Sequence, residues 1–245
     1  LRSIEKTKIF EDNIQLKIET KILRSQWYCA TGNYKSSSEL TETIISEANR
    51  IGNPGLRLEA ELILASIILD NEPQSIFEIL KSILIESNRL GYGEMADKAG
   101  LLAAKAYMNS NDYFNAEGWI EKILSNSKLT KKNYLEARSI YGYLKYLSHK
   151  FDEAIEILIE NESSSAASGY LPSALNAALM QIEIFIKCGK VSRSRESMNR
   201  AKAYAGKMLS TLPDDGSLKY YLNSKAMLYL KNAENSIGDK ELIQL

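Results

Sequence analysis

Apolar residues recur along this chain at intervals of three and four positions, and short polar turns separate the stretches that contain them. One such stretch carries Ala116, Trp119, Ile120, Ile123 and Leu124. This spacing places the apolar side chains on one face of a helix, whereas a half-buried strand would show strict alternation. The pattern therefore predicts an all-α protein.

The helices are predicted to form pairs. The first helices of the pairs are expected near residues 13–31, 56–70, 94–109, 131–148, 172–187 and 217–232. The second helices are expected near 35–51, 74–90, 113–126, 152–161 and 191–209. Residues 161–169, NESSSAASG, are small and polar and predict a protease-sensitive loop. Residues 1–12 are interpreted as the remnant of a preceding helix, and 237–245 as a fraying end or the start of another second helix.

A short motif of two polar residues followed, in most copies, by a bulkier one recurs five times. Its third residue is Tyr34, Pro73, Tyr113, Phe151 and Val191, at intervals of 39, 40, 38 and 40 residues. A constant period of this size indicates a repeat architecture, in which each helix pair covers the apolar face of the next. We expect an α-solenoid of about five to six stacked antiparallel pairs, with residues 1–245 forming a single helical-repeat domain.

The chain begins with Leu1 rather than Met, which suggests a fragment of a longer protein. The cut ends of a solenoid expose apolar faces that neighbouring repeats would have covered. We therefore expect the chain to self-associate or to require another subunit.

The repeats resemble a known family. In the third unit, the small residues Ala103 and Ala104 precede Tyr107, and Tyr113 precedes Ala116. The fourth unit repeats this arrangement with Tyr141, Gly142, Phe151 and Ala154. Other units depart from it at Ser37, Pro73 and Ser194. Over about residues 14–232, the array resembles a degenerate tetratricopeptide repeat (TPR) solenoid whose period exceeds the usual length of about 34 residues.

Two segments carry a narrower resemblance, to the carboxy-terminal repeats of anaphase-promoting complex subunit five. They are Ser87 to Tyr92, continuing through Ala99 to Leu124, and Asn199 to Tyr204, followed by Tyr221, Ala226, Leu228 and Tyr229. Arg200 replaces an acidic residue of that family's pattern, and the intervening loop shares little with it. The resemblance implies an architectural role in the ubiquitin ligase that controls mitosis and the cell cycle.

Composition narrows the function classes. Lys and Arg number 31 and Asp and Glu number 31, which argues against a general electrostatic attraction to nucleic acid or to an anionic membrane. No apolar run approaches the length of about 18 residues that a membrane span needs. His149 is the single histidine, and Cys29 and Cys188 form no CxxC pair. We therefore expect no metal site, no cofactor and no enzymatic activity.

These three residues have structural interpretations. His149 is expected in an exposed turn, although a role as general base is the alternative. Cys29 and Cys188 are expected to pack near the ends of first helices, and isolated thiols are typical of a reducing compartment, the cytoplasm or the nucleus.

Charge separates along the fourth and fifth repeats. Residues 152–162 carry five acids and no base, whereas 187–207 carry seven bases and one acid. One interpretation is that these segments bind charged partners, which makes Arg193, Arg195, Arg200 and Lys202 candidate partner-binding residues. The other is that the stacked helices bring the opposite charges together or expose them to solvent.

The chain has 14 tyrosines, and three of them, Tyr141, Tyr143 and Tyr146, crowd one short helical segment. A single helix face cannot bury positions two residues apart. Tyr143 and Tyr146 are therefore candidate partner contacts, since tyrosine is enriched at interfaces. The alternative is burial between neighbouring helices of the solenoid.

Two functions fit these patterns. The first is a non-catalytic scaffold that binds other protein subunits of a large complex. The second is a ligand- or peptide-responsive regulatory domain, such as that of a bacterial transcription regulator, in which binding alters the solenoid's pitch.

Overall fold

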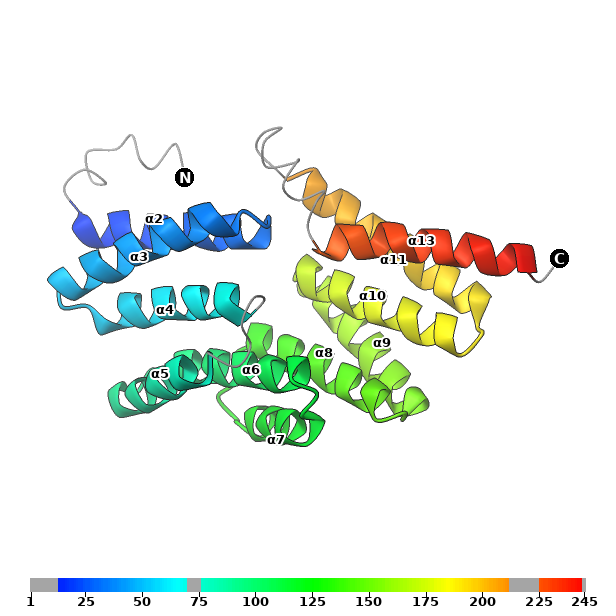
Figure 1. The fold of residues 1–245 in the computed structure, drawn as a ribbon, viewed down its shortest axis with the longest axis horizontal. Helices are drawn as coiled ribbons and strands as arrows, with labels where there is room; N and C mark the ends of the chain where they lie inside the picture. Colours follow the sequence, from blue (N-terminus) through cyan, green and yellow to red (C-terminus); the bar gives the residue numbers. More distant parts are fainter. Residues whose placement is uncertain (1–12, 70–75, 212–224, 244–245) are drawn as a thin grey trace. The chain divides into compact units, whose positions relative to one another are not determined.

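The computed structural model describes residues 13–69, 76–211 and 225–243, and every regular element in these ranges is an α-helix. The chain divides into two compact units, residues 1–111 and 112–245, which are described separately. Figure 1 labels the helices in chain order.

The first unit contains five described helices. They are α2 (Ile14–Ala30), α3 (Tyr34–Arg50), α4 (Pro54–Leu69), α5 (Ile76–Leu90) and α6 (Gly93–Asn109). Consecutive helices pack together, and α4 also contacts both α2 and α6. First helices therefore contact the first helices of neighbouring pairs, as stacking of antiparallel pairs requires.

The second unit contains six described helices. They are α7 (Tyr113–Leu124), α8 (Lys131–Leu147), α9 (Phe151–Ala167), α10 (Leu171–Lys187), α11 (Val191–Leu209) and α13 (Lys225–Ile243). Neighbours in this series pack together, and α10 additionally contacts α8 and α13 (Figure 1). The same stacking scheme therefore continues through this unit.

The repeated motif marks the turn inside each helix pair. Tyr34, Tyr113, Phe151 and Val191 each begin a second helix, as predicted, whereas Pro73 lies outside the described residues. The turns before Tyr34, Phe151 and Val191 share one set of backbone bonds. In the last of them, Gly189 N donates to Ile186 O at 3.2 Å and Lys190 N donates to Phe185 O at 2.8 Å. These bonds satisfy carbonyls at the end of the first helix and require a left-handed residue after it.

The left-handed position is Gly189 in the fifth pair but His149 in the fourth, where φ is 61°. A side chain in this conformation is strained, and glycine relieves that strain. His149→Gly is expected to stabilise the protein by about 0.5–1 kcal/mol, measured from the urea unfolding midpoint. The matched change Gly189→Ala should destabilise it by about 1 kcal/mol, because φ is +68° and no neighbouring atom lies within 4 Å to offset the strain. Shifts of the same sign in both variants would contradict this account.

Two serines replace the small alanine of the repeat pattern, and the helices remain closely packed at both positions. Ser37 is fully buried, and its Oγ donates to Ser25 O at 2.8 Å. Ser194 is also fully buried, and its Oγ donates to Val191 O at 2.8 Å. Each serine is small and has its hydroxyl satisfied locally, so it occupies the position of alanine without leaving an unpaired polar atom.

Two predicted boundaries are wrong. Residues 161–167 are not a loop but the last two turns of α9, because Asn161, Glu162 and Ser165 are buried against neighbouring helices. Asn161 Nδ2, for example, donates to Ser139 Oγ of α8 at 2.7 Å. The last helix does not end near 232 but continues to Ile243, and the predicted segments 1–12 and 217–224 lie outside the described residues.

Candidate partner-binding groove

A buried carboxylate joins three helices of the second unit. Glu162 of α9 is 4% exposed. Its Oε1 accepts from Arg200 Nε at 2.8 Å and from Tyr204 Oη at 3.0 Å, both on α11. Its Oε2 accepts from Gln181 Nε2 of α10 at 2.7 Å and from Arg200 Nη2 at 3.2 Å. Four donors therefore compensate this charge for its loss of hydration.

Arg200 completes the network. Its Nη2 also donates to Gln181 Oε1 and to Ser197 Oγ, both at 3.0 Å. Hydrogen bonding to Glu162 raises the pKa of Arg200, and burial followed by the nearby Glu162 raises the pKa of Tyr204. The Arg200 side chain remains 41% exposed, so its guanidinium also borders an open space next to the network.

That space is a groove of about 400 Å³ that crosses α9, α10 and α11. Its walls and floor are Ile159, Glu162, Ser163, Gln181, Phe185, Arg193, Glu196, Ser197, Arg200 and Tyr204. Its volume lies within the range of about 300–1,000 Å³ that is typical of ligand sites. Ile159 is 44% exposed and supplies an apolar surface at one wall.

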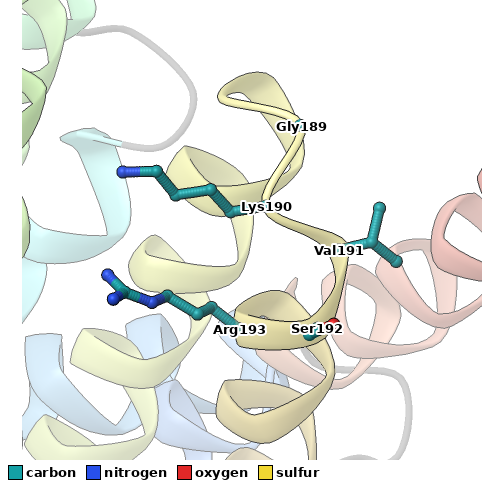
Figure 2. A pocket seen from close by; sticks show the side chains of 5 residues that line it. All are labelled: Gly189, Lys190, Val191, Ser192 and Arg193. Atoms are coloured by element: carbon teal, nitrogen blue, oxygen red, sulfur yellow. The ribbon is translucent and has the colours of Figure 1, made fainter.

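A second hollow, of about 450 Å³, adjoins the groove at the turn between α10 and α11. It is lined by Gly189, Lys190, Val191, Ser192 and Arg193. Figure 2 shows the Lys190 and Arg193 side chains extending in the same direction, away from Val191. Arg193 lines both hollows, and its guanidinium lies 6.0 Å from the centre of the Phe185 ring. The two hollows therefore share a cationic boundary.

The predicted basic residues have different surroundings. Arg200 pairs with Glu162, so the expectation that stacked helices bring opposite charges together is confirmed for this pair. Lys202 forms an ion pair with Glu234 of α13, and Arg195 lines neither hollow. Arg193 is the predicted residue that stays exposed at the groove. Gln181 was not predicted from the sequence. The feature that could have indicated it is its uncharged polar side chain within the strongly apolar helix α10.

The predicted tyrosines Tyr143 and Tyr146 belong to α8 and lie around Glu183 of α10. Tyr146 is 3% exposed and its Oη donates to Glu183 Oε1 at 2.9 Å. Tyr229 Oη of α13 donates to Glu183 Oε2 at 3.2 Å. Tyr143 is partly buried beside Tyr146. Tyr146 therefore packs between helices, in agreement with the alternative interpretation of burial rather than partner contact.

The free energy of unfolding should fall at alkaline pH because of this tyrosine cluster. Burial, together with Glu183, raises the pKa of Tyr146 and Tyr229 well above the ordinary value of 10.0. Above that pH the unfolded chain loses these protons while the folded chain keeps them, so stability is full below pH 10 and falls as pH rises. We expect the urea midpoint to fall above pH about 10, and less steeply in the Tyr146→Phe/Tyr229→Phe variant. Equal slopes in both proteins would contradict this assignment.

The remaining candidate residues form no catalytic arrangement among the described residues. His149 is exposed in its turn, with its ring edge against Phe151, as expected. Cys29 and Cys188 are partly buried free thiols. Within 13–69, 76–211 and 225–243, no cluster of three or more His, Cys, Asp or Glu side chains could hold a metal ion. In those same ranges, no helix is long and apolar enough to cross a membrane.

The stacked pairs and their shared turn geometry define a TPR-like helical-repeat fold. A crystal structure from Podosopora anserina, described as a kinesin light chain with nearly identical TPR-like repeats, has a similar fold, with a TM-score of 0.51. The match covers 80% of this chain and 98% of that one, at 16% sequence identity. No protein-family profile and no curated protein sequence matches the chain.

Proposed function

We propose that this chain is a non-catalytic scaffold that binds other protein subunits through its helical-repeat surface. The observation that supports this proposal is the open groove over α9, α10 and α11, with Lys190 and Arg193 at its end, two cations that form no ion pair with the described residues. Residues from two consecutive repeats build this surface, as in repeat proteins that bind extended partners along a stack. The proposed location is the cytoplasm or the nucleus.

The first test is purification of the full-length tagged protein from its own cells, followed by mass spectrometry. A fixed, stoichiometric set of co-purifying proteins would support the scaffold proposal. The narrower proposal, the anaphase-promoting complex, rests on the two sequence segments described above. Recovery of that ligase's subunits would support it, and a different fixed set would reject it while keeping the scaffold.

A ligand-responsive regulatory domain is the second proposal. It is favoured by the convergence of Glu162, Gln181 and Arg200 at the base of the groove, because a few placed polar groups under an apolar wall are typical of small-molecule sites. Recovery of the protein alone from cells, together with a thermal shift on adding a metabolite extract passed through a filter of small cut-off, would support this proposal over the scaffold.

A further inference from the structure

We infer that the groove and its turn bind an extended acidic segment of a partner protein, with one large apolar side chain in the groove and acidic residues at Lys190 and Arg193. This inference rests on the proposed scaffold function and specifies the chemistry of the partner. Four features of the surface support it.

The first feature is unpaired positive charge. Lys190 and Arg193 are exposed, and neither forms an ion pair with any residue that the structure describes. Some other cations of this unit are paired: Lys145 with Glu117 at 2.6 Å, and Arg138 with Glu160 at 2.5 Å. The side chains of Lys190 and Arg193 extend in parallel, so that one short acidic segment could reach both (Figure 2).

The second feature is that the fold does not require a cation at position 193. Arg193 lies two residues after the start of its second helix. The equivalent residues are Ser36 in α3, Asn115 in α7 and Glu153 in α9. These neutral and acidic residues occupy the same place in the same turn geometry. The positive charge at Arg193 is therefore particular to the surface of the fifth pair.

The third feature is an apolar anchor beside the cations. Ile159 of α9 is 44% exposed, and Phe185 of α10 lies under the Arg193 guanidinium. A large apolar side chain from a partner would cover Ile159, since Phe185 is only 3% exposed, and would bring its neighbouring residues to Arg193. Burial of that apolar area supplies affinity, and the charges set orientation and partner choice.

The fourth feature gives the segment a direction. Glu196 is exposed one turn after Arg193 on the same wall, where it repels a partner's carboxylate. Arg200 already pairs with Glu162, although its Nη1 makes no hydrogen bond with the described residues and remains a donor for a neutral acceptor. The acids are therefore placed at the Gly189 end and the apolar residue toward Arg200.

The length of the segment follows from the helix. Arg193 and Arg200 are seven residues apart, which at a rise of about 1.5 Å per residue is about 10 Å. An extended peptide covers this distance in about three residues at about 3.3 Å each. We therefore expect the apolar residue and the acids to lie within about four residues of each other in the partner.

The test is selection from a display library of random peptides of about 12 residues against the whole protein, a length that spans the groove with flanks on both sides. Selected sequences should pair a large apolar residue with two or more nearby acids. In fluorescence-polarisation binding, Lys190→Glu/Arg193→Glu should weaken the selected peptides about tenfold or more. Raising the salt from about 50 to 300 mM should also weaken binding to the wild type.

The matched control is Arg50→Glu/Lys132→Glu, which makes the same change in net charge at exposed residues outside the groove. This variant should bind the selected peptides within about twofold of the wild type. The inference is overturned if the library yields no enriched sequence, if the enriched sequences lack acids, or if both charge variants bind equally. It is also overturned if single-stranded oligouridine competes with the peptides and binds more tightly than they do.

Failure of this inference is distinguishable from failure of the scaffold proposal. If the purified assembly keeps its full set of proteins in the Lys190→Glu/Arg193→Glu variant, partners bind elsewhere on the repeats and the scaffold stands without this site. If that variant loses one protein while Arg50→Glu/Lys132→Glu keeps it, both proposals are supported.

Discussion

Replacing Glu162 with alanine is expected to lower the free energy of unfolding by about 3 kcal/mol. The change leaves the Nε2 group of Gln181, which is fully buried, with a single longer bond to Leu158 O at 3.3 Å. Arg200 and Tyr204 lose their shared acceptor as well. Urea unfolding followed by far-ultraviolet circular dichroism measures the effect.

Glu160 provides the matched control for this prediction. It lies two residues earlier on α9, and its side chain is 62% exposed in an ion pair with Arg138. Glu160→Ala should change stability by no more than about 0.5 kcal/mol, because exposed pairs contribute little. Equal effects of the two substitutions would show that the buried network does not hold α9, α10 and α11 together.

Replacing Gly142 with alanine is expected to destabilise the protein by about 1–2 kcal/mol, even though alanine is the better helix former. A Cβ at this position would lie 2.8 Å from Leu158 Cγ and 3.2 Å from Ile157 Cγ2, both on α9. Leu158 is fully buried and cannot move aside cheaply. The pair α8–α9 would have to separate, and the urea midpoint should fall accordingly.

Gly118→Ala should have the opposite sign. Gly118 lies in the interior of α7, and a Cβ there would meet no atom within 4 Å. The substitution should stabilise the protein by about 0.5–1 kcal/mol, which is the difference in helix propensity. Two shifts of the same sign would mean that helix propensity, rather than the contact between α8 and α9, determines the effect at Gly142.

The helices and the turns within pairs were predictable because their causes are local. The spacing of Ala116, Ile120 and Ile123 specifies the buried face of α7, and each of these residues is indeed buried. The same holds for the turns, because Gly189 and the backbone bonds beside it belong to one segment of about six residues.

The end of α9 was not predictable by the same means. The sequence NESSSAASG has the composition of a loop, and its helical form depends on partners in other helices. Asn161 bonds to Ser139, and Ser165 Oγ bonds to Ser173 Oγ at 3.1 Å. Tertiary contacts of this kind override local preference, since an isolated segment cannot supply them.

The all-α class, the period near 40 residues and the position of most pairs follow from the amino-acid sequence, because helical periodicity and turn chemistry act between neighbours in the chain. Which charged side chains pair inside the protein and which stay exposed depends instead on how the helices stack. Glu162 meets Arg200 38 residues later and Tyr204 42 residues later, about one repeat along the stack. Lys190 and Arg193 meet no such carboxylate in the described chain, because stacking fixes which helix faces are opposed, and composition does not.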